Sequence, residues 1–285
     1  MSADLSKIEK PLVLYHSPCR DGWCAAFLAK LRWPDAELVG LQYGDPVRRD
    51  PQDLGQTTFI VVVDGKPTVI DVAGRHVLIL DFSFKRNVLV QMQEFADSFL
   101  VLDHHKSAAE DLAGLDFAVF DRERSGCGLA LDHFFPGSRE RQAQIEANTY
   151  VSRGIASDSD HISWAEGGLK GVAPTWLAIL ALTVEDWDLW RYKRRGTKEA
   201  CAYLDTLERD VESWNALPSF AEMAQRGSAV LVYQKKQVER IAEHAHPVSW
   251  PFGNGVVLNA VNSPVLQSEV GEALYEKDPT KASLV

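Results

Sequence analysis

The sequence has no long apolar run. In its 285 residues there is no stretch of about eighteen consecutive apolar residues, the length that a membrane-spanning helix requires. Residues 1–7 also lack the apolar core of a signal peptide. These absences argue against a membrane partner and predict a cytoplasmic location.

Cysteine and net positive charge are also lacking. The four cysteines, at positions 19, 24, 127 and 201, form neither a disulfide framework nor the paired spacing of a zinc ribbon, so we expect reduced thiols. The formal net charge is −10, whereas proteins that bind duplex nucleic acid without sequence preference need a positive surface. The sequence therefore argues against a nucleic-acid duplex as partner.

The residues that are present are those of an ordinary globular protein. Apolar residues make up 46% and charged residues 25% of the chain. The length suits one large domain, or a large and a small one. Apolar runs alternate with segments of helical spacing, which predicts an α/β fold with a parallel sheet.

Three apolar runs each end in residues that can bind a metal. They are typical of buried strands in a parallel sheet. The runs and the residues that follow them are 11–15 with His16, 76–80 with Asp81, and 98–102 with Asp103, His104 and His105. The carboxyl ends of such strands converge on one crevice, so residues distant in sequence can share an ion there. Because imidazole and carboxylate are both ligands for divalent cations, the set predicts a metal site, with Asp21 five residues after the first strand end.

Each of these acids has a simpler interpretation when it is taken alone. An aspartate after a strand is often a helix N-cap or a turn residue. The convergence of three strand ends favours the metal site for the set as a whole.

Four motifs along the chain resemble those of a known family. They are residues 16–22 (HSPCRDG), 80–84 (LDFSF), 103–105 (DHH) and 184–190 (VEDWDLW). In this order, each at an expected element boundary, they resemble the DHH phosphoesterases, in particular their exopolyphosphatase-like and oligoribonuclease-like branch. The resemblance implies a parallel-sheet domain with helices on both faces, a linker helix and a small, truncated α/β substrate-binding domain.

The resemblance also implies a role for most of the site residues. Two divalent cations would be bound, with Mn²⁺ favoured over Mg²⁺ or Co²⁺, and Asp81 would bridge them. The further ligands would be Asp21, His104 and Asp186 on one ion and His16 on the other. Asp188 would support a ligand or bind the metal itself.

The catalytic pair implied by the resemblance is His105 with Asp103. His105 would face the phosphate as a hydrogen-bond donor or general acid. Asp103 would orient a histidine rather than bind the metal, which fixes the tautomer of the ring.

Position 19 departs from the commoner family motif, in which an aspartate precedes the residue corresponding to Arg20. Cys19 stands there instead. Its thiolate could be a ligand, which would favour softer ions, or the side chain could act as a small buried apolar group. The sequence leaves both interpretations open.

Residues for binding the substrate phosphate are suggested at two helix starts. Ser125 and Gly126 begin a helix where the family places a serine-containing turn that faces the site. Lys85 and Arg86 begin another helix beside the crevice, although a solvated helix start gives the same pattern. The basic residues that follow position 190 either form ion pairs on the surface or guide an anionic substrate.

The resemblance divides the chain into three parts. These are a DHH phosphoesterase catalytic domain over 1–210, linker helices over 211–248 and a partial DHH-associated substrate-binding domain over 249–285. Segment 157–161 (SDSDH) could suggest a second metal site, but no apolar strands deliver its residues to a common point, which favours a polar loop.

The function implied is that of a Mn²⁺-dependent hydrolase. Its substrate would be a small phosphorylated molecule, such as a nucleotide or a short single-stranded oligonucleotide, cleaved at a phosphodiester or phosphomonoester bond. The alternatives are a phosphoanhydride hydrolase that acts on polyphosphate or pyrophosphate, and a nucleotide-binding module whose metal site has degenerated at Cys19.

Overall fold

The computed structural model of the 285-residue chain describes residues 7–151, 171–249 and 256–285. The acidic segment 157–161, with its alternative interpretation as a second metal site, lies outside the described residues. Among the helices of the described ranges, none combines the length and the apolar character needed to cross a membrane.

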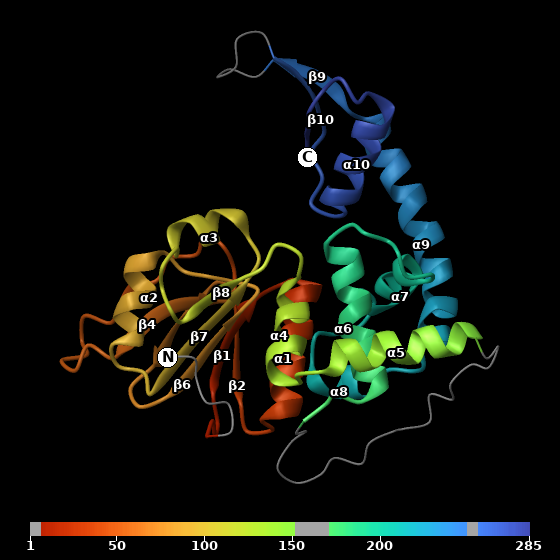
Figure 1. The fold of residues 1–285 in the computed structure, drawn as a ribbon. Helices are drawn as coiled ribbons and strands as arrows, with labels where there is room; N and C mark the ends of the chain where they lie inside the picture. The colour runs from red at the N-terminus through yellow and green to blue at the C-terminus, as the bar shows by residue number, and fades with distance from the viewer. Residues whose placement is uncertain (1–6, 152–170, 250–255) are drawn as a thin grey trace.

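A five-stranded parallel sheet forms the centre of the larger part of the molecule (Figure 1). Its strands, in spatial order, are β2 (Glu37–Leu41), β1 (Leu12–His16), β6 (His76–Leu80), β7 (Ser98–Asp103) and β8 (Ala118–Phe120). Every neighbouring pair is parallel. Because β1, β6 and β7 are adjacent, the three strands that end in candidate ligands lie side by side.

The central strands are buried on both faces, as their continuous apolar sequences predict. Alternate residues of each strand face two separate cores. Val13 and Leu78 belong to the first core, and Leu14 and Ile79 belong to the second. The first core is closed by helices α1 (Arg20–Arg32), α4 (Gly126–Phe134) and α6 (Thr175–Asp188). The second is covered by α2 (Arg86–Gln93) and by an antiparallel sheet. Helices therefore lie on both faces, which confirms the predicted fold class.

The Asp64-Gly65 pair between the apolar runs 58–63 and 68–72 predicts a β-hairpin, and the antiparallel sheet contains it. Its strands are β3 (Arg48–Arg49), β4 (Thr58–Val63) and β5 (Lys66–Asp71). Asp64 and Gly65 have φ of 49° and 74°, the left-handed conformation that a two-residue hairpin turn requires. Residues 44–56, rich in proline and charge, favour a loop, and the two-residue strand β3 lies within them.

Helices surround the first core and extend beyond it. Besides α1, α4 and α6 they are α5 (Ser138–Val151), α7 (Thr197–Leu204), α8 (Val211–Asn215) and α9 (Phe220–Glu243). Helix α3 (Lys106–Asp111) lies instead beside α2 (Figure 1). Helix α9 lies against α7 because Gly227 allows it: a Cβ there would be 1.7 Å from the carbonyl oxygen of Glu199.

A smaller α/β unit follows α9 (Figure 1). It contains β9 (His246–Ser249), β10 (Val257–Ala260), α10 (Gln267–Lys277) and β11 (Ser283–Leu284), with the strands in the order β11-β10-β9. Val238 and Ala242 of α9 form its core with Val270 and Leu274 of α10. The apolar pattern of residues 256–262 predicts a strand and residues 268–274 the start of a helix, and β10 and α10 confirm both. The domain boundaries at 210 and 248 remain predictions.

Candidate metal centre

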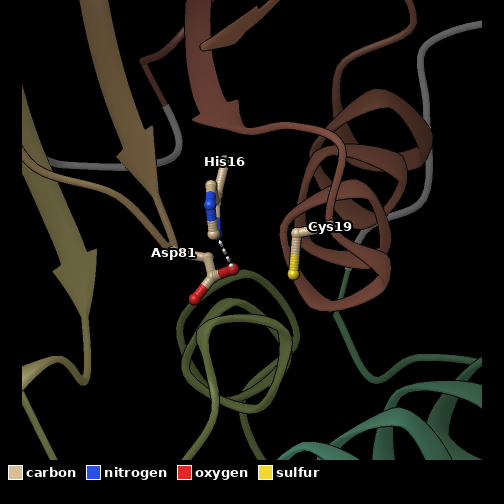
Figure 2. A group of neighbouring side chains, drawn as sticks. All are labelled: His16, Cys19 and Asp81. Atoms are coloured by element: carbon tan, nitrogen blue, oxygen red, sulfur yellow. Dashed lines mark hydrogen bonds and ion pairs between the residues drawn. The ribbon is translucent and has the colours of Figure 1, made fainter. Parts of the chain in front are cut away.

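The candidate ligands meet at the carboxyl edge of the parallel sheet. His16 is the last residue of β1, Asp81 directly follows β6, and His104 directly follows β7. Asp21 lies in the first turn of α1 and is buried. Figure 2 shows His16, Cys19 and Asp81 converging from the ends of neighbouring segments.

Asp81 occupies the middle of this group. Its Oδ2 lies 3.3 Å from Nδ1 of His16, and its Oδ1 lies 3.2 Å from Nε2 of His104. The residue has a φ of 53°, a conformation that costs free energy for a side chain with a Cβ and that often occurs at functional sites. A Cβ at Gly126 would lie 2.3 Å from that of Asp81, so only glycine lets α4 start here.

His104 has carboxylates on three sides. Besides Asp81, Oδ2 of Asp188 lies 3.6 Å and Oδ2 of Asp21 lies 4.0 Å from its Nε2. Burial lowers the pKa of His104, but the hydrogen bond with Asp81 and the three acids outweigh it and raise the pKa to about 9. A site that holds a proton so firmly is also electrostatically suited to a cation.

The acids of the cluster change each other's pKa values. Burial, together with the charges of Asp81 and Asp188, raises the pKa of Asp21. Burial and the charge of Asp81 raise the pKa of Asp188 to about 6. Buried carboxylates this close together repel one another when they are ionised, and a bound cation would remove that repulsion.

The described residues fit divalent cations. Three groups have potential ligand atoms within 4.8 Å of one another: His16 with Cys19 and Asp81, Asp81 with His104 and His105, and Asp21 with His104 and Asp188. Asp81 and His104 each belong to two groups. Oδ1 of Asp81 is buried and faces Nε2 of His104 at 3.2 Å. A buried carboxylate oxygen that faces imidazole nitrogen amid further carboxylates has the chemistry of a metal ligand.

Asp103 holds His105 in place. The buried carboxylate accepts hydrogen bonds from the backbone N–H groups of His104 (2.7 Å) and His105 (3.2 Å), and its Oδ1 lies 2.7 Å from Nδ1 of His105. This hydrogen bond raises the pKa of His105 against the effect of burial. Asp103 therefore lies where an orienting acid is expected.

Tyr43 is a member of this site that the sequence analysis missed. Its hydroxyl donates to Oδ2 of Asp103 at 3.4 Å and lies 3.4 Å from Nδ1 of His105. Its ring lies edge-on to that of His16, with centroids 5.1 Å apart. The one signal available was its place two residues after β2, the strand beside β1.

The predicted phosphate contacts at Ser125 and Gly126 need correction, because these groups bind Asp21 instead. The hydroxyl of Ser125 donates to Oδ1 of Asp21 at 2.7 Å, and the backbone N–H groups of Gly126 and Cys127 donate to the same carboxylate at 2.6 and 3.0 Å. Ser125 is fully buried. The start of α4 therefore orients a candidate ligand, and its free N–H groups are used in doing so.

The metal-binding role predicted for Asp186 also needs correction, whereas Asp188 lies among the potential ligands, which is one of the two roles expected for it. Both carboxylate oxygens of Asp186 accept hydrogen bonds, from the backbone N–H groups of Lys193 and Arg194 and from the hydroxyl of Thr197. Asp188, not Asp186, belongs to a potential ligand group. Helix α6 extends to Asp188, and two positions differ by about 200° around a helix, so the two side chains point in nearly opposite directions.

The substrate contact predicted for Arg86 also needs correction, because its guanidinium is bound elsewhere. Its guanidinium donates to the carbonyl oxygens of Asp111 and Ala113, both at 3.1 Å. It therefore fastens the end of α3 to the start of α2. Lys85 is exposed at the N-cap of α2, and its predicted role in substrate binding stays untested.

Cys19 is the N-cap residue of α1, and its sulfur points into the group with His16 and Asp81 (Figure 2). Burial and the charges of Asp81 and Asp21 raise the pKa of the thiol. A thiolate at this position is therefore unfavourable without a cation beside it.

Known proteins similar to this chain are distant. No protein-family model matches it. An uncharacterized protein of Acanthamoeba polyphaga mimivirus is 26% identical over 284 residues, which cover 96% of this chain but 56% of that protein. The chain therefore spans little more than half the length of this relative.

Two solved structures are similar at low levels. One is an uncharacterized protein from Helicobacter pylori G27, with a TM-score of 0.41 and 12% identity, covering 96% of this chain and 81% of that one. The other is the DHH domain of a member of the S1p family of ribosomal proteins, with a TM-score of 0.43 and 13% identity, covering 94% of this chain and 68% of that one. At these levels any assignment of function depends on the site itself.

Proposed function

We propose that the protein is a metal-dependent phosphoesterase of the DHH type. Its substrate is a small phosphorylated anion such as a nucleotide or a short oligonucleotide. The observation that carries the proposal is the sharing of Asp81 and His104 between adjacent groups of potential ligands at the ends of β1, β6 and β7.

The residues of the cluster divide naturally between two cations. His16, Cys19 and Asp81 would hold one, and Asp81, Asp21, His104 and Asp188 would hold the other. When bound, the cations would neutralise charge on the phosphoryl group and lower the pKa of an attacking water. Mn²⁺ suits the mixture of oxygen and nitrogen ligands.

The protein's own groups position the substrate and handle protons. Asp103 occupies Nδ1 of His105, so Nε2 is the nitrogen left to bind a phosphate oxygen or to transfer a proton to the leaving group. The His105 side chain is 37% exposed, so a substrate can reach it. Asp103 and Tyr43 restrict the ring to one orientation, which lowers the entropy cost of the reactive arrangement.

A hydrolysis assay with Mn²⁺ tests the proposal. The substrates are a dinucleotide, a generic phosphodiester and polyphosphate. We expect cleavage of the first two, and Asp81→Ala should abolish it, because this carboxylate serves both groups of ligands. Full activity of Asp81→Ala would contradict the proposal, cleavage of polyphosphate alone would favour a phosphoanhydride hydrolase, and binding of nucleotide without turnover would favour a degenerate binding module.

A further inference from the structure

An aromatic and basic segment adjoins the metal centre. Residues 187–195 (WDLWRYKRR), which we call the aromatic loop, begin in the last turn of α6. The ring of Tyr192 lies between two tryptophans, with its centroid 5.6 Å from that of Trp187 and 5.9 Å from that of Trp190. Trp190 is 44% exposed, whereas the other two rings are half-buried. The loop therefore presents one aromatic side chain to solvent, supported by two others.

The backbone of the aromatic loop is held in a fixed conformation. Trp190 and Tyr192 have φ of 53° and 48°, which is unfavourable for residues with a Cβ. Asp186 holds this conformation by accepting four successive backbone N–H groups: its carbonyl accepts those of residues 191 and 192, and its carboxylate those of 193 and 194. Trp190 is thus exposed on a rigid support.

The aromatic loop lies close to the candidate ligands. Asp188, two residues before Trp190, has its Oδ2 3.6 Å from Nε2 of His104, and two residues span at most roughly 7 Å of chain. The same short stretch of backbone therefore carries both Trp190 and Asp188, a member of a potential ligand group. The guanidinium of Arg20, next to Asp21 in the chain, lies 4.8 Å from the ring centroid of Trp187.

Basic residues lie in and beside the aromatic loop, although the chain as a whole is acidic and burial together with the charges of Glu272 and Glu269 raises the pKa of Tyr192. Lys193, Arg195 and Lys198 are exposed, and Nζ of Lys198 lies 4.0 Å from the ring centroid of Tyr192. Alternating aromatic and basic side chains are typical of surfaces that bind single-stranded nucleotides, because bases stack on the rings and phosphates are attracted to the cations.

We propose that Trp190 is the base-stacking residue of the substrate site, so that the substrate is a nucleotide and not polyphosphate. The inference rests on the proposed function, because it places the substrate phosphate at the metal centre. A corner of the fold that served packing alone would bury Trp190 together with Trp187 and Tyr192. The exposure of Trp190 on a fixed backbone beside Asp188 is what a stacking surface requires.

A comparison of two ligands isolates the contribution of the base. One is the 5′-methylenephosphonate analogue of adenosine monophosphate, whose P–C bond a phosphoesterase cannot cleave, and the other is its base-free ribose counterpart. In calorimetric titrations with Mn²⁺ present, we expect the full-length protein to bind the first about 5- to 150-fold more tightly, the worth of one stacked base. Trp190→Ala should bring this ratio close to one, and Trp190→Phe should keep most of it.

Tyr233→Ala is the matched control, because Tyr233 is a 64% exposed aromatic residue on α9, and this variant should keep the wild-type ratio. Equal affinity of wild-type protein for the two ligands, no binding of either, or an unchanged ratio in Trp190→Ala would overturn the inference. Because neither ligand is cleaved, the result is independent of turnover. A base-dependent affinity in a protein without hydrolytic activity would support the stacking site while contradicting the phosphoesterase.

Discussion

At the scale of single residues, Asp81 and the two adjacent histidines have different contacts in the site. Asp81 contacts His16 through one carboxylate oxygen and His104 through the other. His104 faces Asp81, Asp188 and Asp21, whereas Nδ1 of His105 is occupied by Asp103. Because the two adjacent histidines have such different partners, their substitution should affect metal content and turnover differently.

We expect His104→Ala to lose both bound metal and turnover. His105→Ala should lose far more in turnover, about 10²- to 10⁴-fold, the usual contribution of a positioned acid or base, than in metal content. Metal analysis of the purified variants beside kcat separates the two effects. Equal metal loss would show that both histidines are ligands, as the group of Asp81, His104 and His105 would also allow.

Tyr43 should act as a positioning residue. Tyr43→Phe removes the hydroxyl that contacts Asp103 and His105 but keeps the ring that packs on His16. A hydrogen bond of this kind contributes about 1 kcal/mol, so kcat should fall about three- to ten-fold while KM and metal content change little. Tyr233→Phe, on the exposed side of α9, is the control. An unchanged kcat in Tyr43→Phe would remove Tyr43 from the site.

At the scale of elements, the end of α6 sets which acid reaches the metal centre. The apolar residues of 175–182 predict a helix that leads into an acidic turn, and in a turn either Asp186 or Asp188 could face the site. The helix continues through Asp188, so helical geometry separates Asp186 from Asp188. Sequence spacing alone does not show where a helix ends, and for this reason it did not exclude Asp186 as a ligand.

Two conservative substitutions at the end of α6 should separate stability from metal binding. Asp186→Asn cannot accept all three hydrogen bonds of the native carboxylate, and the free energy of unfolding should fall by about 2–3 kcal/mol. Asp188→Asn should leave the metal-free protein as stable as wild type but lower its metal content. Urea unfolding in EDTA and metal analysis give both quantities. Metal loss in Asp186→Asn with unchanged stability would reverse the assignment.

The start of α4 was predicted to contact the substrate phosphate, and the reason why it does not lies in a contact between two helices. Ser125 caps the helix, as predicted, with its hydroxyl accepting from the N–H of Gly128. The sequence could not show that Asp21, more than one hundred positions earlier, enters this N-terminus before any phosphate could. Contacts between helices that are distant in sequence were the part of the site that local patterns did not contain.

At the scale of the whole molecule, the parallel sheet was predictable and its surroundings were less so. Strands β1, β6 and β7 are short apolar runs. Strands that are buried on both faces can be predicted from such runs. Once they are adjacent, the convergence of His16, Asp81 and His104 follows from the topology. Short elements such as β3 and β11 have two residues each, and their pairing depends on distant partners.

We infer that the carboxylate of Asp81 is shared between two cations. Calorimetric titration of the metal-free, full-length protein with Mn²⁺, beside Asp81→Ala, tests it most directly. We expect two bound ions per wild-type chain and a loss of affinity at both positions in the variant, because Asp81 contacts ligands of both groups. An absence of Mn²⁺ binding by the wild-type protein, or identical titrations of the two proteins, would contradict it.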